Sequence, residues 1–249
     1  MVLPPKLARA GQLLEQRIAP PFYRRTPIIT LSRSSQREIV QRLGLRDENV
    51  RVVPPGIEAG FTPGGTRADR PLVVGVGRLM PSKAFDILIE AVAQARRAVP
   101  DARLVIAGEG YERDALRRRI GELGAEEWCE LAGRVDDDTL LHLYRSAWVV
   151  ASASRSEGWG MTLTEAAACG TPAVASRISG HIDAVEDGVT GLLTDTDREL
   201  PAALSKILTD RDFREGLGRA AEAGAARFSW ERTAHDTLAV LTAQCHPPR

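Results

Sequence analysis

The chain has 249 residues and carries 33 lysines and arginines against 33 aspartates and glutamates, so its formal net charge is zero. That balance argues against a protein that grips nucleic acid through its phosphates, because such a protein needs a strongly basic face. With 43% hydrophobic and 27% charged residues, the composition is that of a folded globular protein rather than a disordered one.

The 3 cysteines and 4 histidines stand singly along the sequence. Their spacing fits neither a zinc site nor a disulfide framework, so we expect no metal and a reducing compartment. The N-terminal stretch is basic but lacks the apolar core of a signal peptide, and no apolar run approaches the ~20 residues of a membrane span. We therefore expect a cytoplasmic protein that at most contacts the inner face of a membrane.

The first 56 residues contain secondary structure but too few strands for a complete sheet. The predicted elements are a helix at 6–18, a strand at 28–32, a helix opened by Ser35 with Glu38 completing a capping box, and a strand at 50–53. We expect the strand at 28–32 to have no sheet to join. The following residues, 57–70, are rich in glycine and proline and predict a linker.

From Pro71 onward, short apolar runs alternate with amphipathic stretches. The predicted strands are at 72–77, 103–108, 129–133, 147–152, 172–176 and 191–193. The predicted helices are at 84–98, 111–123, 137–146 and 161–169, followed by three more at 197–209, 211–226 and 230–243. Continuous apolar runs are typical of strands covered on both faces, so the pattern predicts an α/β fold with a doubly wound, mostly parallel sheet. Ligands of such sheets bind in the loops that follow the strands.

The segment from Ser156 to Pro172 is the most informative of these loops. Glu157 ends a loop, Gly158 and Gly160 allow a ligand to approach the backbone, and a helix begins near Met161 with Glu165 in its first turns. The two carboxylates could both accept hydrogen bonds from the paired hydroxyls of a sugar or a ribose. Alternatively, Glu157 is a solvated loop residue and Glu165 simply favours a helix N-terminus.

A second loop follows the first strand of the sheet and carries two cations. Arg78 comes directly after Gly77, and Lys83 lies five residues further on. An arginine fork and a lysine point charge suit a diphosphate. The alternative interpretation is a solvated basic loop.

Together these segments resemble glycosyltransferase family 4, the retaining, nucleotide-sugar-dependent enzymes of the GT-B fold. The matching segments are GRLMPSK at 77–83, IAGEG, LAGRV, the pair Glu157 and Glu165, AACGTPAVAS and SGHIDAVEDGVTGLL. The resemblance implies a Rossmann-like donor-binding domain at 71–228, a crossover helix and tail at 229–249, and a remnant of the N-terminal acceptor domain at 1–56.

The resemblance also implies a role for each matching residue. Arg78 and Lys83 would neutralise the diphosphate of the donor and its departing charge, while Glu157 would hold the transferred sugar. Glu165 would hold the ribose hydroxyls. The other donor-binding positions would be Gly77, Arg134, Val135, Gly158, Trp159, Gly160, Met161 and Thr162.

For the reaction, the resemblance implies transfer of a hexosyl unit from a UDP- or GDP-sugar to a sugar, lipid or small-alcohol acceptor. The anomeric configuration would be retained, and neither a metal nor a cofactor would be needed. No nucleic acid is expected as a partner.

The sequence departs from the family pattern at several places. Ala84 stands where glycine is usual, a mild change if the backbone there is helical. The segment SGHID also differs from the family pattern. We interpret its His181 as a surface-loop histidine, with a sugar or acceptor contact as the alternative. Most of the acceptor domain is absent from the sequence, so we expect the chain to bind the donor but to catalyse poorly without another chain.

Two other functions compete with transfer. The chain could be a noncatalytic module that binds a nucleotide sugar, or half of an enzyme whose acceptor domain is a separate chain. An NAD-dependent oxidoreductase is the third interpretation, but Met80 stands where the third glycine of the dinucleotide fingerprint belongs.

Overall fold

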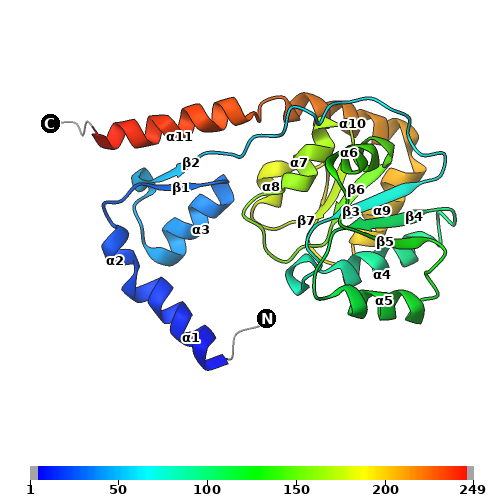
Figure 1. Ribbon diagram of the computed structural model, residues 1–249, viewed down its shortest axis with the longest axis horizontal. Coiled ribbons are helices and arrows are strands. Elements are labelled where there is room, and N and C mark those ends of the chain that lie inside the picture. The colour runs from blue at the N-terminus through cyan, green and yellow to red at the C-terminus, as the bar shows by residue number, and fades with distance from the viewer. Residues whose placement is uncertain (1–4, 246–249) are drawn as a thin grey trace. The chain divides into compact units, whose positions relative to one another are not determined.

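The computed structural model describes residues 5–245, which form two compact units (Figure 1). Unit 2 comprises Ile57–Ser229, and unit 1 comprises the residues up to Gly56 together with those from Trp230 onward. Each unit is described by itself below.

Unit 2 is built on a six-stranded sheet in which every pair of neighbouring strands is parallel. The strands are β3 (Leu72–Val76), β4 (Arg103–Ala107), β5 (Cys129–Gly133), β6 (Val149–Ser152), β7 (Ala173–Ser176) and β8 (Gly191–Thr194). Their order is β5-β4-β3-β6-β7-β8. The chain therefore runs outward from β3 in one direction and then returns to β6 and runs outward in the other, which is the doubly wound arrangement predicted from the sequence.

Helices cover both faces of this sheet (Figure 1). They are α4 (Phe85–Ala95), α5 (Arg113–Glu122), α6 (Asp137–Ser146), α7 (Met161–Ala168), α8 (His181–Ala184), α9 (Leu200–Thr209) and α10 (Arg211–Ala225), with a 3-10 turn η3 at Pro81–Lys83. One core lies between the sheet and α4, α5 and α9, and a second lies between the sheet and α6 and α7. Adjacent residues of one strand serve opposite cores, as Val73 and Val74 do in β3, because strand side chains alternate between faces. This explains why the apolar runs are continuous.

The segment 57–70, predicted as a linker, lies in unit 2 and has no helix or strand. The Arg67 guanidinium holds it by donating to the carbonyl oxygens of Ala147 at 2.5 Å and Gly170 at 2.6 Å, and to the Thr171 hydroxyl. Trp148 Nε1 donates to the Ala68 carbonyl at 2.7 Å. The segment is therefore tied to the carboxyl ends of α6 and α7.

Unit 1 contains a small parallel sheet of two strands, β1 (Ile28–Thr30) and β2 (Val50–Val52). Its helical elements are α1 (Pro5–Leu13), the π-helical turn η1 (Leu14–Ile18), α2 (Pro20–Tyr23), α3 (Arg33–Leu43), the 3-10 turn η2 (Asp47–Asn49) and α11 (Trp230–Cys245). The expectation that the strand at 28–32 has no sheet to join is wrong, because β1 pairs with β2 from Ile28 with Val50 to Thr30 with Val52.

The start of α3 also differs from the prediction. The helix begins at Arg33 rather than after Ser35, and the Ser32 side chain is its N-cap, accepting a hydrogen bond from the Ser35 N–H at 3.1 Å. Ser32 is extended, with φ of −141° and ψ of 156°, as an N-cap residue must be. Ser32, Ser34 and Ser35 lie close together and offer alternative caps, and the sequence pattern selected the wrong one. No helix within residues 5–245 is long and apolar enough to cross a bilayer.

Candidate active site

The strand order changes direction at the centre of the unit 2 sheet, between β3 and β6. β3 and β6 are neighbours, and the connections that leave them run to opposite faces of the sheet, because α4 covers one face and α7 the other. Loops at such a point separate at the carboxyl edge and leave room for a ligand. The loop after β3 contains Gly77, Arg78 and Lys83, and the loop after β6 contains Glu157 and Gly158.

Lys83 and Glu157 meet across this point. Lys83 Nζ donates to Glu157 Oε1 at 2.6 Å, although the two residues are 74 positions apart in sequence. About a fifth of each side chain remains exposed, 22% for Lys83 and 17% for Glu157. The structure therefore joins two of the predicted catalytic residues in one contact that solvent, and hence a ligand, can still reach.

Glycines allow the loops at this edge to approach one another closely. A Cβ added to Gly108, which follows β4, would lie 1.9 Å from the Gly77 carbonyl oxygen, and a Cβ on Gly77 would lie 3.3 Å from Lys83 Cε. Gly108 has a φ of +145°, a conformation that other residues rarely adopt. Gly108 requires glycine because backbone packs directly on backbone there, whereas a side chain at position 77 would press on the Lys83 side chain.

Ala84, directly after Lys83, has a left-handed backbone with φ of 47° and ψ of 47°. The expectation of a right-handed helical backbone at this position is therefore wrong. The left-handed conformation costs a residue with a Cβ about 1–2 kcal/mol. Ala84 forms the N-cap of α4 and is 4% exposed, so the surrounding core holds this strained turn in place behind Lys83.

The loop that carries Glu157 is fixed on both sides. The Arg155 N–H donates to the Ser82 carbonyl at 2.8 Å, next to Lys83. The Arg155 guanidinium makes two hydrogen bonds to the Asp197 carboxylate, at 2.8 and 2.7 Å. These contacts tie the loops after β3, β6 and β8 together around the Lys83–Glu157 pair.

His181 lies beneath this loop rather than on the surface. It is 1% exposed, and its Nδ1 is 2.9 Å from the Ser176 carbonyl oxygen. Burial lowers the pKa of His181 below 6.5, so the ring is neutral at pH 7. The interpretation as a surface-loop histidine is wrong, because Gly180, with φ of +85°, turns the chain inward against the backbone of Glu157 and Trp159.

Helix α7 begins at this edge. Gly160 is its N-cap and Met161 its first residue, so the N–H groups of Met161 and Thr162 have no acceptor within the helix. Trp159, just before the cap, is 6% exposed and contacts Phe228 edge to face, with ring centroids 5.2 Å apart. Trp159 anchors the loop while Gly158, which is exposed, leaves backbone accessible.

Glu165 lies one turn further along α7 and is half-buried. Its Oε2 accepts a hydrogen bond from the Tyr144 hydroxyl at 2.8 Å. Burial raises the pKa of Glu165, and the charges of Glu58 and Asp137 raise this pKa further, whereas the Tyr144 hydrogen bond opposes the shift. Within the described residues, the Glu165 side chain makes no hydrogen bond or ion pair with Lys83 or Glu157.

The remaining predicted residues are placed but have no marked contacts. Arg78 and Arg134 are exposed, and no hydrogen bond or ion pair of either side chain is found within residues 5–245. Arg134 and the half-buried Val135 lead from β5 into α6, whose N-cap Asp136 accepts from the Thr139 N–H at 2.9 Å. Asp137, at the start of α6, acts on the pKa of Glu165, which links this loop to α7 electrostatically.

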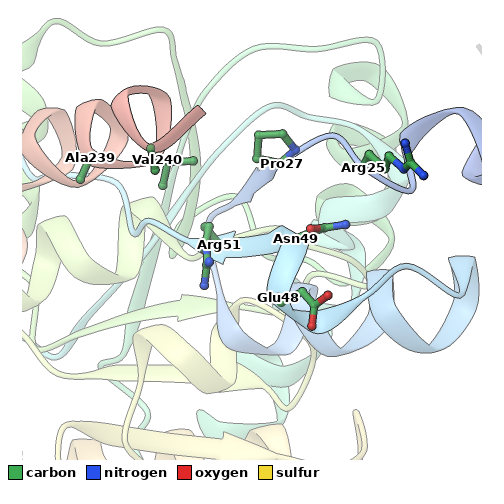
Figure 2. Close-up of a pocket in the computed structure, with 8 residues that line it drawn as sticks. Arg25, Pro27, Glu48, Asn49, Arg51, Ala239 and Val240 are labelled. Atoms are coloured by element: carbon green, nitrogen blue, oxygen red, sulfur yellow. The ribbon is translucent and has the colours of Figure 1, made fainter. Parts of the chain in front are cut away.

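Unit 1 has a separate cavity of about 490 Å³ (Figure 2). It lies between Ala239 and Val240 of α11 on one side and the residues around β2, including Asn49 and Arg51, on the other. None of the predicted site residues lines it. Among residues 5–245, no group of three or more His, Cys, Asp or Glu side chains is arranged to hold a metal ion.

Residues 58–224 match the family model of glycosyl transferases group 1. The chain belongs to this family. The match confirms the resemblance that the motifs predicted, and it covers nearly all of unit 2.

Curated members of the family extend the comparison. The D-inositol 3-phosphate glycosyltransferase of Acidothermus cellulolyticus is 35% identical over 234 residues, covering 86% of this chain and 52% of the relative. The enzyme of the same name from Kribbella flavida is 37% identical over 223 residues, with 81% and 53% covered. The chain thus spans about half the length of these relatives.

Solved structures agree on the fold. Anabaena HepE in complex with UDP and glucose aligns with a TM-score of 0.80 at 25% identity, covering 92% of this chain and 66% of that one. Sucrose-phosphate synthase from Thermosynechococcus elongatus aligns with a TM-score of 0.83 at 24% identity, covering 98% and 64%. These structures are glycosyltransferases of the GT-B fold, so the predicted fold class is confirmed.

Sequence reasoning missed three groups that support the site. Tyr144 lies in an ordinary amphipathic helix, and nothing in its spacing points to Glu165. Arg155 pairs with Asp197 across 42 positions, and Arg67 reaches helix ends more than 75 positions away. Only the three-dimensional arrangement of the strands brings these residues to their partners.

Proposed function

We propose that this chain binds a nucleoside diphosphate sugar at the carboxyl edge of the unit 2 sheet and serves in transfer of its hexosyl unit. The Lys83–Glu157 contact is the observation that carries the proposal. A cation and a carboxylate from the loops after two different strands are in contact and partly exposed. The cation suits a diphosphate and the carboxylate suits the hydroxyls of a sugar. Family membership supports the same function.

In the proposal, each predicted residue has a distinct task. Lys83 and Arg78 balance the charge of the diphosphate, and Arg78 is available for this because the residue is exposed. The first N–H groups of α7 add the positive end of the helix dipole. Glu157 and the backbone of Gly158 hold the sugar, and Glu165 holds the ribose.

As the sugar–phosphate bond breaks, negative charge grows on the leaving diphosphate and positive charge on the sugar ring. Lys83 and Arg78 would stabilise the former, which is where electrostatic catalysis contributes most. Retention of the anomeric configuration is part of the proposal and rests on the resemblance to family 4. The anomeric configuration of the glycoside product, determined by NMR, tests it.

The base of the nucleotide would lie beside Arg134 and Val135, contacted through main-chain atoms. Both UDP- and GDP-sugars remain candidates for the donor, and no metal or cofactor takes part. The acceptor belongs to the classes of sugars, lipids or small alcohols, and the name of the curated relatives adds a phosphorylated inositol to the last class. A cytoplasmic location accords with the free, buried thiols of Cys129 and Cys169.

A half-enzyme is the second candidate, and unit 1 favours it. Most of the exposed large hydrophobic side chains of the described residues lie in this unit, including Phe22 at 80% and Leu13 at 55% exposure. Within residues 5–245 its sheet has two strands, and parallel sheets are normally covered on both faces. In this proposal unit 1 is the remnant of an acceptor domain, and a separate polypeptide supplies the rest.

Thermal shift with UDP, GDP and their glucose and mannose conjugates tests donor binding. A ligand at 100 times its Kd stabilises the folded state by about 2.7 kcal/mol, which for a domain of this size raises the melting temperature by about 5–10 °C. Glu165→Gln should lose most of that shift. Glu215→Gln, which removes an exposed partner of Arg211, is the matched control and should keep it. If no nucleotide stabilises the protein, the proposed site is wrong.

A transfer assay separates the two candidates. If the chain alone transfers sugar at a rate typical of enzymes, the half-enzyme proposal fails. If transfer appears only when a second polypeptide is added, while nucleotide binding does not need it, the half-enzyme proposal is supported.

A further inference from the structure

Tyr144 is a fully buried residue next to the proposed site, and the mechanism proposed above assigns it no role. It is 0% exposed, and its ring packs edge to face against Phe61 with centroids 5.6 Å apart. Its backbone carbonyl accepts a hydrogen bond from the Thr171 hydroxyl at 2.6 Å. Both ends of this residue are therefore fixed by unit 2 itself.

The hydroxyl of Tyr144 ends at a carboxylate, 2.8 Å from Glu165 Oε2. Burial and the negative charge of Glu165 raise the pKa of Tyr144 well above 10, so the phenol keeps its proton and remains a donor. Within residues 5–245, the other carboxylate oxygen, Oε1, has no hydrogen-bond partner. Because Glu165 is only half-buried, that oxygen can accept from a ligand.

We propose that Tyr144 is a positioning residue, which holds one oxygen of Glu165 so that the other faces the hydroxyls of a ribose. A glutamate has three rotatable side-chain bonds, and ordering such a side chain on binding weakens the affinity for the ligand by about three- to tenfold. Tyr144 removes this cost beforehand because its rigid ring is anchored in the core. This inference rests on the proposed function and adds how the site selects ribonucleotides.

The test compares a nucleotide with its analogue that lacks the ribose hydroxyls. The probes are UDP and 2′,3′-dideoxy-UDP, or the guanosine pair if GDP gives the larger thermal shift, with Kd measured by calorimetry. In the unmodified protein the dideoxy analogue should bind at least tenfold more weakly, because hydrogen bonds to a charged acceptor are lost. Tyr144→Phe keeps the ring and removes only the hydroxyl.

We expect Tyr144→Phe to weaken binding of the ribonucleotide by about three- to tenfold and to leave binding of the dideoxy analogue unchanged. The ratio of the Kd of the dideoxy analogue to the Kd of the ribonucleotide should therefore fall. Thr171→Val is the control for lost stability, because it removes the hydrogen bonds that the Thr171 hydroxyl makes with the Tyr144 carbonyl and with Arg67 without changing the phenol. This variant should lose stability but keep the ratio.

Glu165→Gln separates a failure of the positioning role of Tyr144 from a failure of the assignment of Glu165 to the ribose. If it lowers the ratio while Tyr144→Phe keeps it within twofold, the positioning role is refuted and the proposed function stands. If Glu165→Gln itself keeps the ratio, the assignment of Glu165 to the ribose fails as well. Should Tyr144→Phe not fold, 3-fluorotyrosine at position 144 retains the donor and should preserve the ratio, and a lower ratio would contradict the inference.

Discussion

The Lys83–Glu157 pair offers a sharp test, because its two members are proposed to bind different parts of one ligand. The pair is 2.6 Å long, and about a fifth of each side chain is exposed. Exposed pairs contribute about 0–1 kcal/mol to stability, whereas removing one partner of a fully buried pair costs about 3–5 kcal/mol. We therefore expect Lys83→Met to lower the free energy of unfolding by about 1–3 kcal/mol.

Binding should respond differently to the two changes. Lys83→Met removes the cation from the diphosphate, so UDP and UDP-glucose should both bind about 10- to 150-fold more weakly, the equivalent of about 1.5–3 kcal/mol. Glu157→Gln releases Lys83 from its partner and removes a sugar acceptor. UDP should then bind within about threefold of the original affinity, while UDP-glucose should lose at least about tenfold.

Calorimetric titration of UDP and UDP-glucose into both variants measures this difference, or the guanosine equivalents if those bind. The ratio of the affinities for the sugar nucleotide and the bare nucleotide should fall in Glu157→Gln and remain constant in Lys83→Met. Glu215→Gln, at an exposed pair of 2.7 Å, controls for the loss of a carboxylate. Equal weakening of both ligands by Glu157→Gln would refute the division of roles.

Three further predictions concern the framework of the site. Arg67→Lys should lower the melting temperature by about 4–8 °C, because a lysine cannot donate to the separate carbonyl acceptors at the ends of α6 and α7. Calorimetry measures the melting temperature, and an unchanged value would contradict the role of Arg67 in holding these helix ends. Ala84→Gly should change stability by less than about 1 kcal/mol, since relief of the left-handed backbone offsets the lost methyl, whereas Ala84→Val should cost about 2 kcal/mol or more in urea unfolding. Because the pKa of His181 is lowered on folding, its neutral form stabilises the protein above about pH 6.5 and this contribution is lost as the pH falls. His181→Gln should remove this acid sensitivity in unfolding experiments, and an identical pH dependence would contradict it.

The sheet of unit 2 was predictable because local patterns determine it. Its strands are short, mostly apolar runs with glycine, proline or serine at or next to at least one end, and burial on both faces favours such runs. The helices between them follow from their apolar spacing, and α6 was predicted with its observed bounds at Asp137–Ser146. The short α8 was missed because four residues give no periodicity.

The site was less predictable, because its geometry depends on contacts distant in sequence. Lys83 and Glu157 could be chosen as chemically suitable residues, but only strand order brings them together. The left-handed Ala84 could not be foreseen, since alanine is usually right-handed helical and the core around it decides otherwise. His181 has an ionisable ring, and from sequence alone such a side chain is expected on the surface. In the structure, Gly180 turns the chain so that His181 lies in the core.

A crystal structure of the chain with a bound nucleoside diphosphate would show where the donor binds. We expect a diphosphate beside Lys83 at the N-terminus of α7, with the ribose hydroxyls within hydrogen-bond distance of Glu165. A nucleotide seated instead in the unit 1 cavity next to Arg51, or against any surface remote from the carboxyl ends of β3 and β6, would contradict it.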